Sequence, residues 1–261
     1  MTDWLALCRA AVDDVRGVLL ELPGRAEREP VVGAGMGGDE TTAIDAAAER
    51  VILARFDGLD VTIVSEEAGI RGDGKTYVVV DPIDGSLNAK RGIGFFSVSI
   101  AVASGPTMGD VDFGFVHDFG TGEEWTATRG EGAQLNGTPL AGQLPKDEIE
   151  ILSFEATRTA AVAEKAAAVV DLAYRLRIMG SLALSLCHLA AGRVDAVCSL
   201  KPARAADIAA GQLLVRERGL AIDLFDTPPF GSAPLDLEGR SRVVAAGTPE
   251  LCRRLARALS A

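Results

Sequence analysis

The apolar positions in the first 146 residues follow a helical spacing and then a strand-like spacing. One apolar helical face runs over residues 3–20, and Leu22-Pro23-Gly24 ends that helix. A second apolar stripe predicts a helix over about 42–56. VTIVSEE and YVVVD are strand-like runs that end in carboxylates. After them FFSVSIAVA, VDFGFVH and EEWTATR, with glycine-containing turns between them, predict an antiparallel meander.

From about residue 147 strands and helices alternate. Strands are expected over 149–154, 175–179 and 194–199, and helices over 158–172, 182–191 and 206–218. SRVVAAG predicts a last strand, and Thr248 and Pro249 begin a closing amphipathic helix as its N-cap and first-turn proline. The pattern predicts an α/β protein whose N-terminal half, 1–146, packs on a C-terminal half, 147–261, with no flexible linker.

Composition restricts the class of protein and of partner. A hydrophobic fraction of 48% and a charged fraction of 24% are typical of a globular chain. No apolar run approaches the ~18 residues that span a bilayer, and the N-terminus lacks a basic leader, so a cytoplasmic location is expected. The net charge of −11 argues against nucleic-acid and anionic-membrane partners. The scattered Cys8, Cys187, Cys198 and Cys252 suggest neither a disulfide framework nor a zinc site.

Acidic residues gather where strands end or helices begin, which is where α/β folds place their binding loops. They are Asp39, Asp45, Glu66, Glu67, Asp81, Asp84 and Asp207. In DPIDGS, Pro82 fixes one backbone angle and Gly85 permits a positive one, so Asp81 and Asp84 are able to point at one spot. Converging carboxylates suit Mg²⁺ or Mn²⁺, and the N–H groups of GSLN would cradle a phosphate beside the metal. This combination is phosphoester hydrolysis chemistry.

Each acid also has an ordinary structural explanation. Asp39 and Glu40 would cap the second helix, Asp207 would cap the helix that follows it, and Glu66 and Glu67 would form a solvated rim. A single acid at a strand end does not distinguish these alternatives from a metal site.

Four segments decide between them because they resemble the inositol monophosphatase superfamily. They are IVSEEAG (63–69), VVDPIDGSLN (79–88), RIMGSLALSLCHLAAGRVDA (177–196) and AADIAAG (205–211), in family order. GMGGDETTAID and the RIMGS block look most like the archaeal-type branch that also acts on fructose 1,6-bisphosphate. The resemblance implies a layered αβαβα sandwich, a homodimer, and a lithium-sensitive phosphomonoesterase with two or three Mg²⁺ per site, Mn²⁺ being an alternative.

The resemblance also implies roles for individual residues. The metal ligands are expected to be Glu66, Asp81, the Ile83 carbonyl, Asp84 and Asp207, with Asp39 serving a third, weakly held ion. Asp45 and Ser86 are expected to pair and activate the attacking water, with Glu66 also catalytic. Substrate contacts are expected from Asp84, Gly85, Ser86, Gly180 and Ser181.

Three departures from the family pattern, the third a pair of residues, bear on the site and on substrate choice. Ala206 stands where an aromatic residue is common, and Leu200 stands where inositol-specific members carry a glutamate. Lys201 and Arg204 add two cations to the same segment. They are either a solvated loop or a clamp on a second phosphate of the substrate.

The expected substrate is therefore a small phosphorylated metabolite, inositol 1-phosphate or fructose 1,6-bisphosphate. Two alternatives remain open: a 3′(2′),5′-bisphosphate nucleotidase, and a catalytically idle family member that acts as a binding or regulatory protein.

Overall fold

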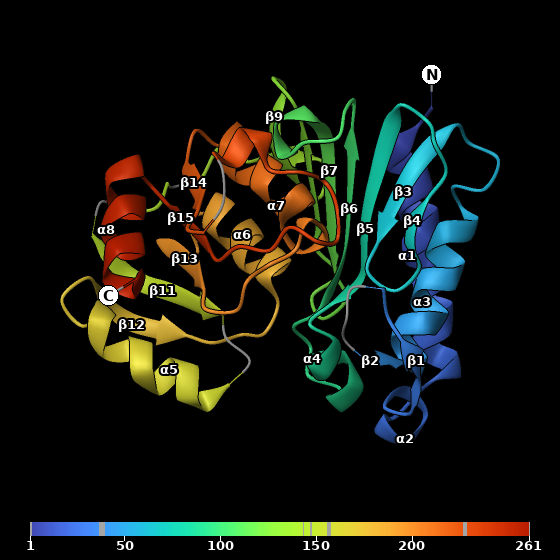
Figure 1. The fold of residues 1–261 in the computed structure, drawn as a ribbon, viewed down its shortest axis with the longest axis horizontal. Coiled ribbons are helices and arrows are strands. Elements are labelled where there is room, and N and C mark those ends of the chain that lie inside the picture. The colour runs from blue at the N-terminus through green and yellow to red at the C-terminus, as the bar shows by residue number, and fades with distance from the viewer. Residues whose placement is uncertain are drawn as a thin grey trace.

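Three layers of helices and two sheets alternate through the molecule in the order helix, sheet, helix, sheet, helix (Figure 1). The computed structural model describes residues 2–36, 40–142, 144–146, 148–155, 158–226 and 229–260. Its helices and 3₁₀ turns are α1 (Trp4–Glu21), α2 (Arg25–Arg28), α3 (Ala43–Ala54), α4 (Ser86–Arg91), η1 (Met108–Asp110), α5 (Thr159–Ala166), η2 (Ala167–Val169), α6 (Leu182–Ala190), α7 (Ala205–Glu217), η3 (Phe230–Ser232) and α8 (Pro249–Ser260). The sandwich expected from the resemblance is confirmed.

The larger sheet has the strand order β10-β9-β8-β7-β6-β5-β3-β4. Its strands are β3 (Val61–Ser65), β4 (Gly69–Arg71), β5 (Thr76–Asp84), β6 (Ser97–Ala103), β7 (Val111–Asp118), β8 (Glu124–Thr128), β9 (Gly132–Leu135) and β10 (Thr138–Pro139). β5 pairs in parallel with β3 and antiparallel with β6, and the second pairing shifts register between Asp81 and Asp84. Such an irregularity redirects side chains, so both aspartates leave the regular alternation of the strand where the site begins.

The smaller sheet has the order β12-β11-β13-β15-β14. Its strands are β11 (Ile149–Glu155), β12 (Ala173–Arg177), β13 (Ala196–Ser199), β14 (Ala221–Leu224) and β15 (Val243–Ala246). β11 and β13 run in parallel, with Glu155 opposite Ser199 at their carboxyl ends. A separate pair, β1 (Val31–Ala34) and β2 (Glu40–Thr42), precedes α3.

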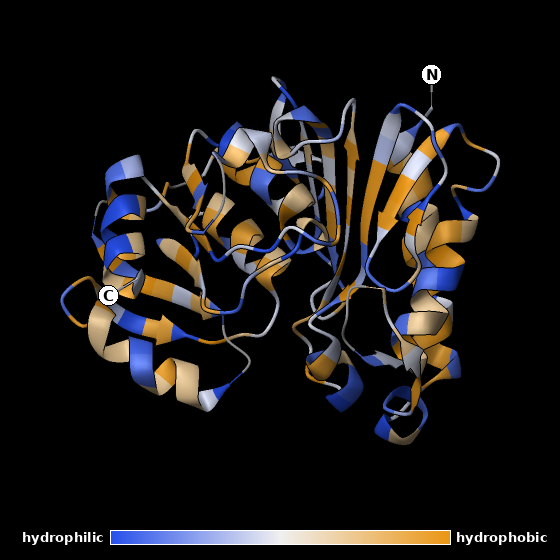
Figure 2. Ribbon diagram, in the orientation of Figure 1, coloured by the Kyte–Doolittle hydropathy of each residue, from blue (hydrophilic) through white to orange (hydrophobic). Residues whose placement is uncertain are grey.

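Apolar side chains fill the spaces between the layers. The central strands of the larger sheet are rich in apolar residues (Figure 2). One cluster lies between α1, α3 and the larger sheet, a second joins that sheet to α6 and α7, and a third lies between the smaller sheet and α8. Burial of these faces is the main stabilising contribution to such a sandwich. It also fixes α7, which contacts both the larger sheet and β14, beside the ends of β3 and β5.

Most elements expected from periodicity are confirmed. The helices expected at 3–20, 42–56, 182–191 and 206–218 are α1, α3, α6 and α7. Thr248 caps α8 as expected, because its Oγ1 accepts a hydrogen bond of 3.2 Å from Leu251 N. The expectation of one helix over 158–172 is wrong, since α5 ends at Ala166 and a 3₁₀ turn leads into β12.

No helix in the described part of the chain combines the length and the apolar character needed to cross a lipid bilayer. The division into halves at residue 146 stays a prediction.

Candidate active site

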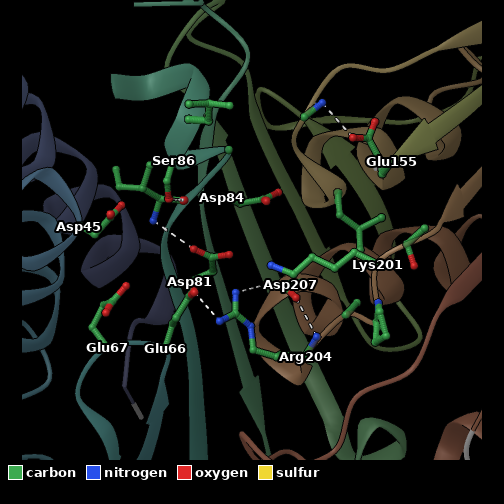
Figure 3. A pocket seen from close by; sticks show the side chains of 18 of the residues that line it. Asp45, Glu66, Glu67, Asp81, Asp84, Ser86, Glu155, Lys201, Arg204 and Asp207 are labelled. Atoms are coloured by element: carbon green, nitrogen blue, oxygen red, sulfur yellow. Dashed lines mark hydrogen bonds and ion pairs between the residues drawn. The ribbon is translucent and has the colours of Figure 1, made fainter. Parts of the chain in front are cut away.

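A pocket lies between the two sheets, at the ends of β3, β5, β11 and β13 (Figure 3). The first turns of α3, α4 and α7 also reach it. Among the residues that line it are Asp45, Glu66, Glu67, Asp81, Ile83, Asp84, Gly85, Ser86, Gly180, Lys201, Arg204 and Asp207. The structure therefore gathers in one pocket nearly all the residues expected from the sequence.

Three acids form the centre of this pocket. Glu66 follows β3, Asp81 lies in β5, and Asp207 lies in the first turn of α7. One carboxylate oxygen from each lies within 4.8 Å of the others. This spacing allows a single cation to contact all three.

Four acids of the pocket share a local arrangement, in which a backbone N–H fixes one oxygen. Asp45 Oδ2 accepts from Thr42 N at 3.3 Å, and Asp207 Oδ2 accepts from Arg204 N at 2.7 Å. Asp81 Oδ1 accepts from Ile83 N at 3.1 Å, and Asp84 Oδ2 accepts from Ala183 N at 2.7 Å. These bonds hold each carboxylate in place and leave its other oxygen facing the pocket, where that of Asp207 also contacts Arg204.

Burial changes the protonation of these acids. It raises the pKa of Glu66 to about 8, against the lowering effect of Arg204 and with further increases from Asp207 and Glu67. The pKa of Asp81 lies well above its usual value because of burial and of the charges of Glu66, Asp84 and Asp207. Burial also raises the pKa of Asp84 to about 7, although the hydrogen bond from Ser181 opposes the increase. The cluster therefore favours bound protons or bound cations over bare negative charge.

Arg204 lies directly against this cluster. Its side chain is only 6% exposed, and it forms ion pairs with Glu66 and, at 3.3 Å, with Asp207 (Figure 3). Burial would lower the pKa of Arg204, but the charges of Asp207, Glu66 and Asp81 raise it. The solvated-loop alternative is thus wrong for Arg204. Its guanidinium also points at carboxylates, which is not the orientation expected of a clamp on a second phosphate.

Lys201 is exposed at the rim of the same pocket, where either alternative remains open for it. Asp39, the expected ligand of a third ion, lies outside the described residues.

The expected water-activating residues share the pocket without bonding to each other. Ser86 Oγ donates to Ile83 O at 2.9 Å, whereas Asp45 Oδ2 accepts from Thr42 Oγ1 at 2.5 Å. The direct Asp45–Ser86 pair is therefore not formed in the structure. Asp45 Oδ1 is buried and has no hydrogen-bond partner among the described residues, so it is available to a water molecule or a metal-bound group.

Ser181 does not have the position expected of a substrate contact. Its side chain is 1% exposed, and its hydroxyl donates to Asp84 Oδ2 at 2.6 Å while accepting from Leu184 N. Ser181 thus positions Asp84 and caps α6, and of the Gly180-Ser181 turn only Gly180 lines the pocket.

Gly85 is required by the close packing of two turns. It has φ of +91°, and a side chain there would lie 3.0 Å from Phe95 O and 3.1 Å from Gly180 O. Only glycine adopts this conformation without strain while allowing the 179–181 turn to approach.

Sequence reasoning missed two buried glutamates and one pocket lysine. Glu49 Oε1 accepts from Ser65 Oγ and from the amides of residues 67 and 68, which orients the turn carrying Glu66. Glu155 Oε2 accepts from Gly180 N at 2.8 Å, and Lys90 lines the pocket. Glu49 lies four residues after Asp45, and Glu155 ends a buried strand as Asp84 does, so both patterns were present in the sequence.

Comparison with known proteins identifies the family. The model of the inositol monophosphatase family matches residues 7–261. The chain belongs to the inositol monophosphatase family. This membership makes the protein a phosphatase.

Individual relatives agree with this assignment. A fructose-1,6-bisphosphatase/inositol-1-monophosphatase of Archaeoglobus fulgidus is 33% identical over 94% of this chain and 93% of its own length. The Nus factor SuhB of Pasteurella multocida is 38% identical over 69% of this chain and 70% of its own length. A crystal structure of an inositol monophosphatase-fructose 1,6-bisphosphatase superposes with a TM-score of 0.85 at 28% identity, covering 98% of this chain and all of the other.

The residues present fit the metal dependence that is general in this family. The donors within contact distance of one another are all carboxylate oxygens, which are preferred by hard divalent cations. Asp45 Oδ1, which is buried and has no hydrogen-bond partner in the described part of the chain, is a further acceptor in the same pocket.

Proposed function

We propose that the protein is a Mg²⁺-dependent phosphomonoesterase that hydrolyses inositol 1-phosphate, fructose 1,6-bisphosphate or both. The observation that carries the proposal is the convergence of Glu66, Asp81 and Asp207 beside the DPIDGS turn. The names of two relatives, from Archaeoglobus fulgidus and Methanothermobacter thermautotrophicus, are both fructose-1,6-bisphosphatase/inositol-1-monophosphatase, and they support the substrate class. The proposal includes two or three Mg²⁺ or Mn²⁺ ions per site, lithium sensitivity, a homodimer and a cytoplasmic location.

Glu66, Asp81 and Asp207 would hold the metal, with the Ile83 carbonyl and the second oxygen of Asp84 as further ligands. Bound there, the metal would acidify a water molecule and neutralise the phosphoryl oxygens. Asp45 Oδ1 accepts the proton of the attacking water, because it is buried, fixed through Oδ2 and otherwise unpartnered in the described structure. The backbone of Gly85 and Ser86 receives the phosphate, and Gly180 forms the opposite wall.

The substrate's remaining part lies toward Gly180, Glu155 and Lys201 in this proposal. Leu200 offers no acceptor for a polyol hydroxyl, while Lys201 and Lys90 bring positive charge to the pocket. A second phosphate is therefore favoured over an additional hydroxyl. One charge-assisted contact contributes about 1.5–3 kcal/mol, which corresponds to roughly tenfold or more in kcat/KM.

A phosphate-release assay tests both parts of the proposal. Protein dialysed against EDTA should be inactive, and Mg²⁺ or Mn²⁺ should restore hydrolysis. Fructose 1,6-bisphosphate should have the higher kcat/KM, and Lys201→Ala should lower it while sparing the rate on inositol 1-phosphate. Full turnover in EDTA would contradict the metal dependence. Equal loss of both substrates in Lys201→Ala would leave Lys201 without a role in choosing between them.

The same substrate panel decides the alternatives. Preference for adenosine 3′,5′-bisphosphate would indicate the nucleotidase. Absence of turnover on every phosphate monoester with Mg²⁺ present would indicate a binding or regulatory protein.

A further inference from the structure

Arg28, the last residue of α2, is a buried arginine that lies where two other helices end. Its side-chain nitrogens donate to Leu22 O at 2.6 Å, to Leu19 O at 3.2 Å and to Ala89 O at 2.8 Å. The first two carbonyls belong to the C-terminal end of α1, and the third belongs to the last turn of α4. One guanidinium therefore joins α4 to α1.

The helix α4 is too short to fix its own position. It has 6 residues, and the glycines at both of its ends have left-handed backbone conformations. A helix of this length is not stable alone, because its few hydrogen bonds do not offset the cost of ordering its backbone. Contacts with the rest of the protein therefore decide where α4 lies. Asn88 supplies one such contact, toward Phe95 and Met179, and Arg28 supplies another at the fully buried Ala89.

The position of α4 matters because half of this helix lines the pocket. Its pocket residues are Ser86, Leu87 and Lys90, and Lys90 follows Ser86 by about one helical turn on the same face. Ala89 instead packs in the apolar cluster between α1, α3 and the larger sheet. A rotation or shift of α4 would move all three pocket residues together. Arg28 does not line the pocket itself.

A second link between α2 and α4 is weaker. Arg91 lies 3.3 Å from Glu29, but both side chains are partly exposed, and solvent screens such ion pairs strongly. Arg28 is only 9% exposed. Its planar guanidinium has several donors and reaches both helices at once, which the single ammonium group of a lysine does not do.

We propose that Arg28 is a positioning residue of the active site, which joins α4 to the end of α1 and thereby fixes Ser86, Leu87 and Lys90 in the pocket. The C-terminal carbonyls of helices carry partial negative charge, which stabilises the buried guanidinium. Substrate affinity then depends on a residue that does not contact the substrate. The inference rests on the proposed function in taking Ser86 and Lys90 as groups that meet the substrate.

Amide hydrogen exchange tests the link between the helices without any substrate. The amides of Ala89, Gly92 and Ile93 report on α4, because they donate to carbonyls of residues 85, 89 and 88. In Arg28→Met these amides should exchange about tenfold faster or more than in the wild type, because α4 opens more easily once it is separated from α1.

Arg218→Met is the matched control. The guanidinium of Arg218 also joins main-chain carbonyls of separate segments, those of Ala190, Leu140 and Gly142, and none of these residues lines the pocket. This variant should leave the exchange of the α4 amides at the wild-type rate.

Steady-state kinetics with saturating Mg²⁺ separates positioning from general stability. A variant that only unfolds more easily has fewer active molecules, so its apparent kcat falls while its KM is unchanged. Arg28→Met should instead raise the KM for the preferred substrate about fivefold or more, because Ser86 and Lys90 are displaced. Arg218→Met should keep the wild-type KM. Arg28→Lys keeps the charge but not the several donors, so its α4 exchange and its KM should both lie between those of the wild type and Arg28→Met.

Exchange of the α4 amides that is no faster in Arg28→Met and Arg28→Lys than in Arg218→Met would overturn the proposal. Faster exchange with an unchanged KM would also overturn it, because Arg28 would then be structural only. If Arg28→Met does not fold, Arg28→Lys decides by the same two measurements. Since exchange is measured without substrate, failure of the wild type on every phosphate monoester would refute the proposed function and leave the link between α1 and α4 standing.

Discussion

At the scale of single residues, the carboxylates of this site combine two tasks that the sequence presented as alternatives. Asp207 caps α7 with Oδ2 and meets Arg204 with Oδ1. Asp45 does the same at α3, where Oδ2 bonds to Thr42 and Oδ1 is unpartnered among described residues. An acid with one oxygen fixed by the backbone loses little further conformational entropy on binding a ligand. The structural and functional explanations of these aspartates are therefore compatible.

Asp45 and Ser86 offer the sharpest test at this scale, because they share the pocket without a direct hydrogen bond. If both position the attacking water, Asp45→Asn and Ser86→Ala should each lower kcat by about 10²-fold or more with little change in KM. The double variant should then be scarcely slower than the slower single variant, since the two losses share one cause. Steady-state kinetics with saturating Mg²⁺ measures all three.

Losses that multiply in the double variant would show that the residues act independently. A near-normal kcat for Ser86→Ala would show that its hydroxyl only bonds to the Ile83 carbonyl.

At the scale of elements, the site depends on a contact between α4 and the turn before α6. Asn88 Nδ2 donates to Met179 O at 2.7 Å and to Phe95 O at 2.8 Å. Glu155 holds the same turn from β11 through Gly180 N. Together these bonds place Ser181 against Asp84, so residues from both sheets determine where that aspartate lies.

Gly85 and Gly92 are the N-cap and C-cap of α4, and both have left-handed backbone conformations. Gly92→Ala should cost only the strain of that conformation, about 1–2 kcal/mol, because nothing lies within 4 Å of the added carbon. Gly85→Ala adds contacts with Phe95 O and Gly180 O, so its unfolding free energy should fall by about 1–3 kcal/mol more.

Urea unfolding measures the two free energies, and phosphate release measures activity. Only Gly85→Ala should lose activity, because its added carbon displaces the turn that holds Asp84. If the two variants lose equal free energy of unfolding and keep equal activity, packing against residues 179–181 is not the reason for glycine at position 85.

The helices could be predicted from the sequence, whereas the long-range contacts of the site could not, and the difference has a physical reason. Amphipathic periodicity gave α1, α3 and α7, because one buried face per element is a local property of the chain. The bond between Asp84 and Ser181 joins positions 97 residues apart, and no local pattern encodes it. The orientation of Arg204 depends in the same way on Glu66, which follows β3 in the other half of the sequence, and was therefore not predicted.

At the scale of the whole molecule, the acidic cluster of the pocket is an internal concentration of negative charge in a chain of net charge −11. Burial raises the pKa of Glu66 to about 8 and that of Asp84 to about 7, and it keeps Asp81 well above its usual value. Without metal, the folded protein thus holds protons that the unfolded chain has already released. Since stability falls with pH wherever the folded state binds more protons, these acids destabilise the metal-free protein as pH rises through their folded pKa values.

Two other sets of groups contribute at the ends of the interval from about pH 6.5 to 8.5. Burial lowers the pKa of His117 and His188, so near pH 6.5 the unfolded chain binds more protons than the folded protein and these histidines oppose the effect. Burial raises the pKa of the four cysteines, so near pH 8.5 the unfolded chain releases thiol protons first and the cysteines add to the effect. The contribution of the acids is therefore clearest between about pH 7 and 8. We therefore expect the Tm measured in EDTA to fall as pH rises through this interval. Saturating Mg²⁺ should reduce or reverse this decrease of Tm with pH, because cations bind the ionised carboxylates and replace the lost protons. Differential scanning calorimetry across the interval, with and without Mg²⁺, checks both. A Tm in EDTA that stays constant or increases would mean that the cluster is already ionised when metal-free, with Arg204 alone sufficient to stabilise it.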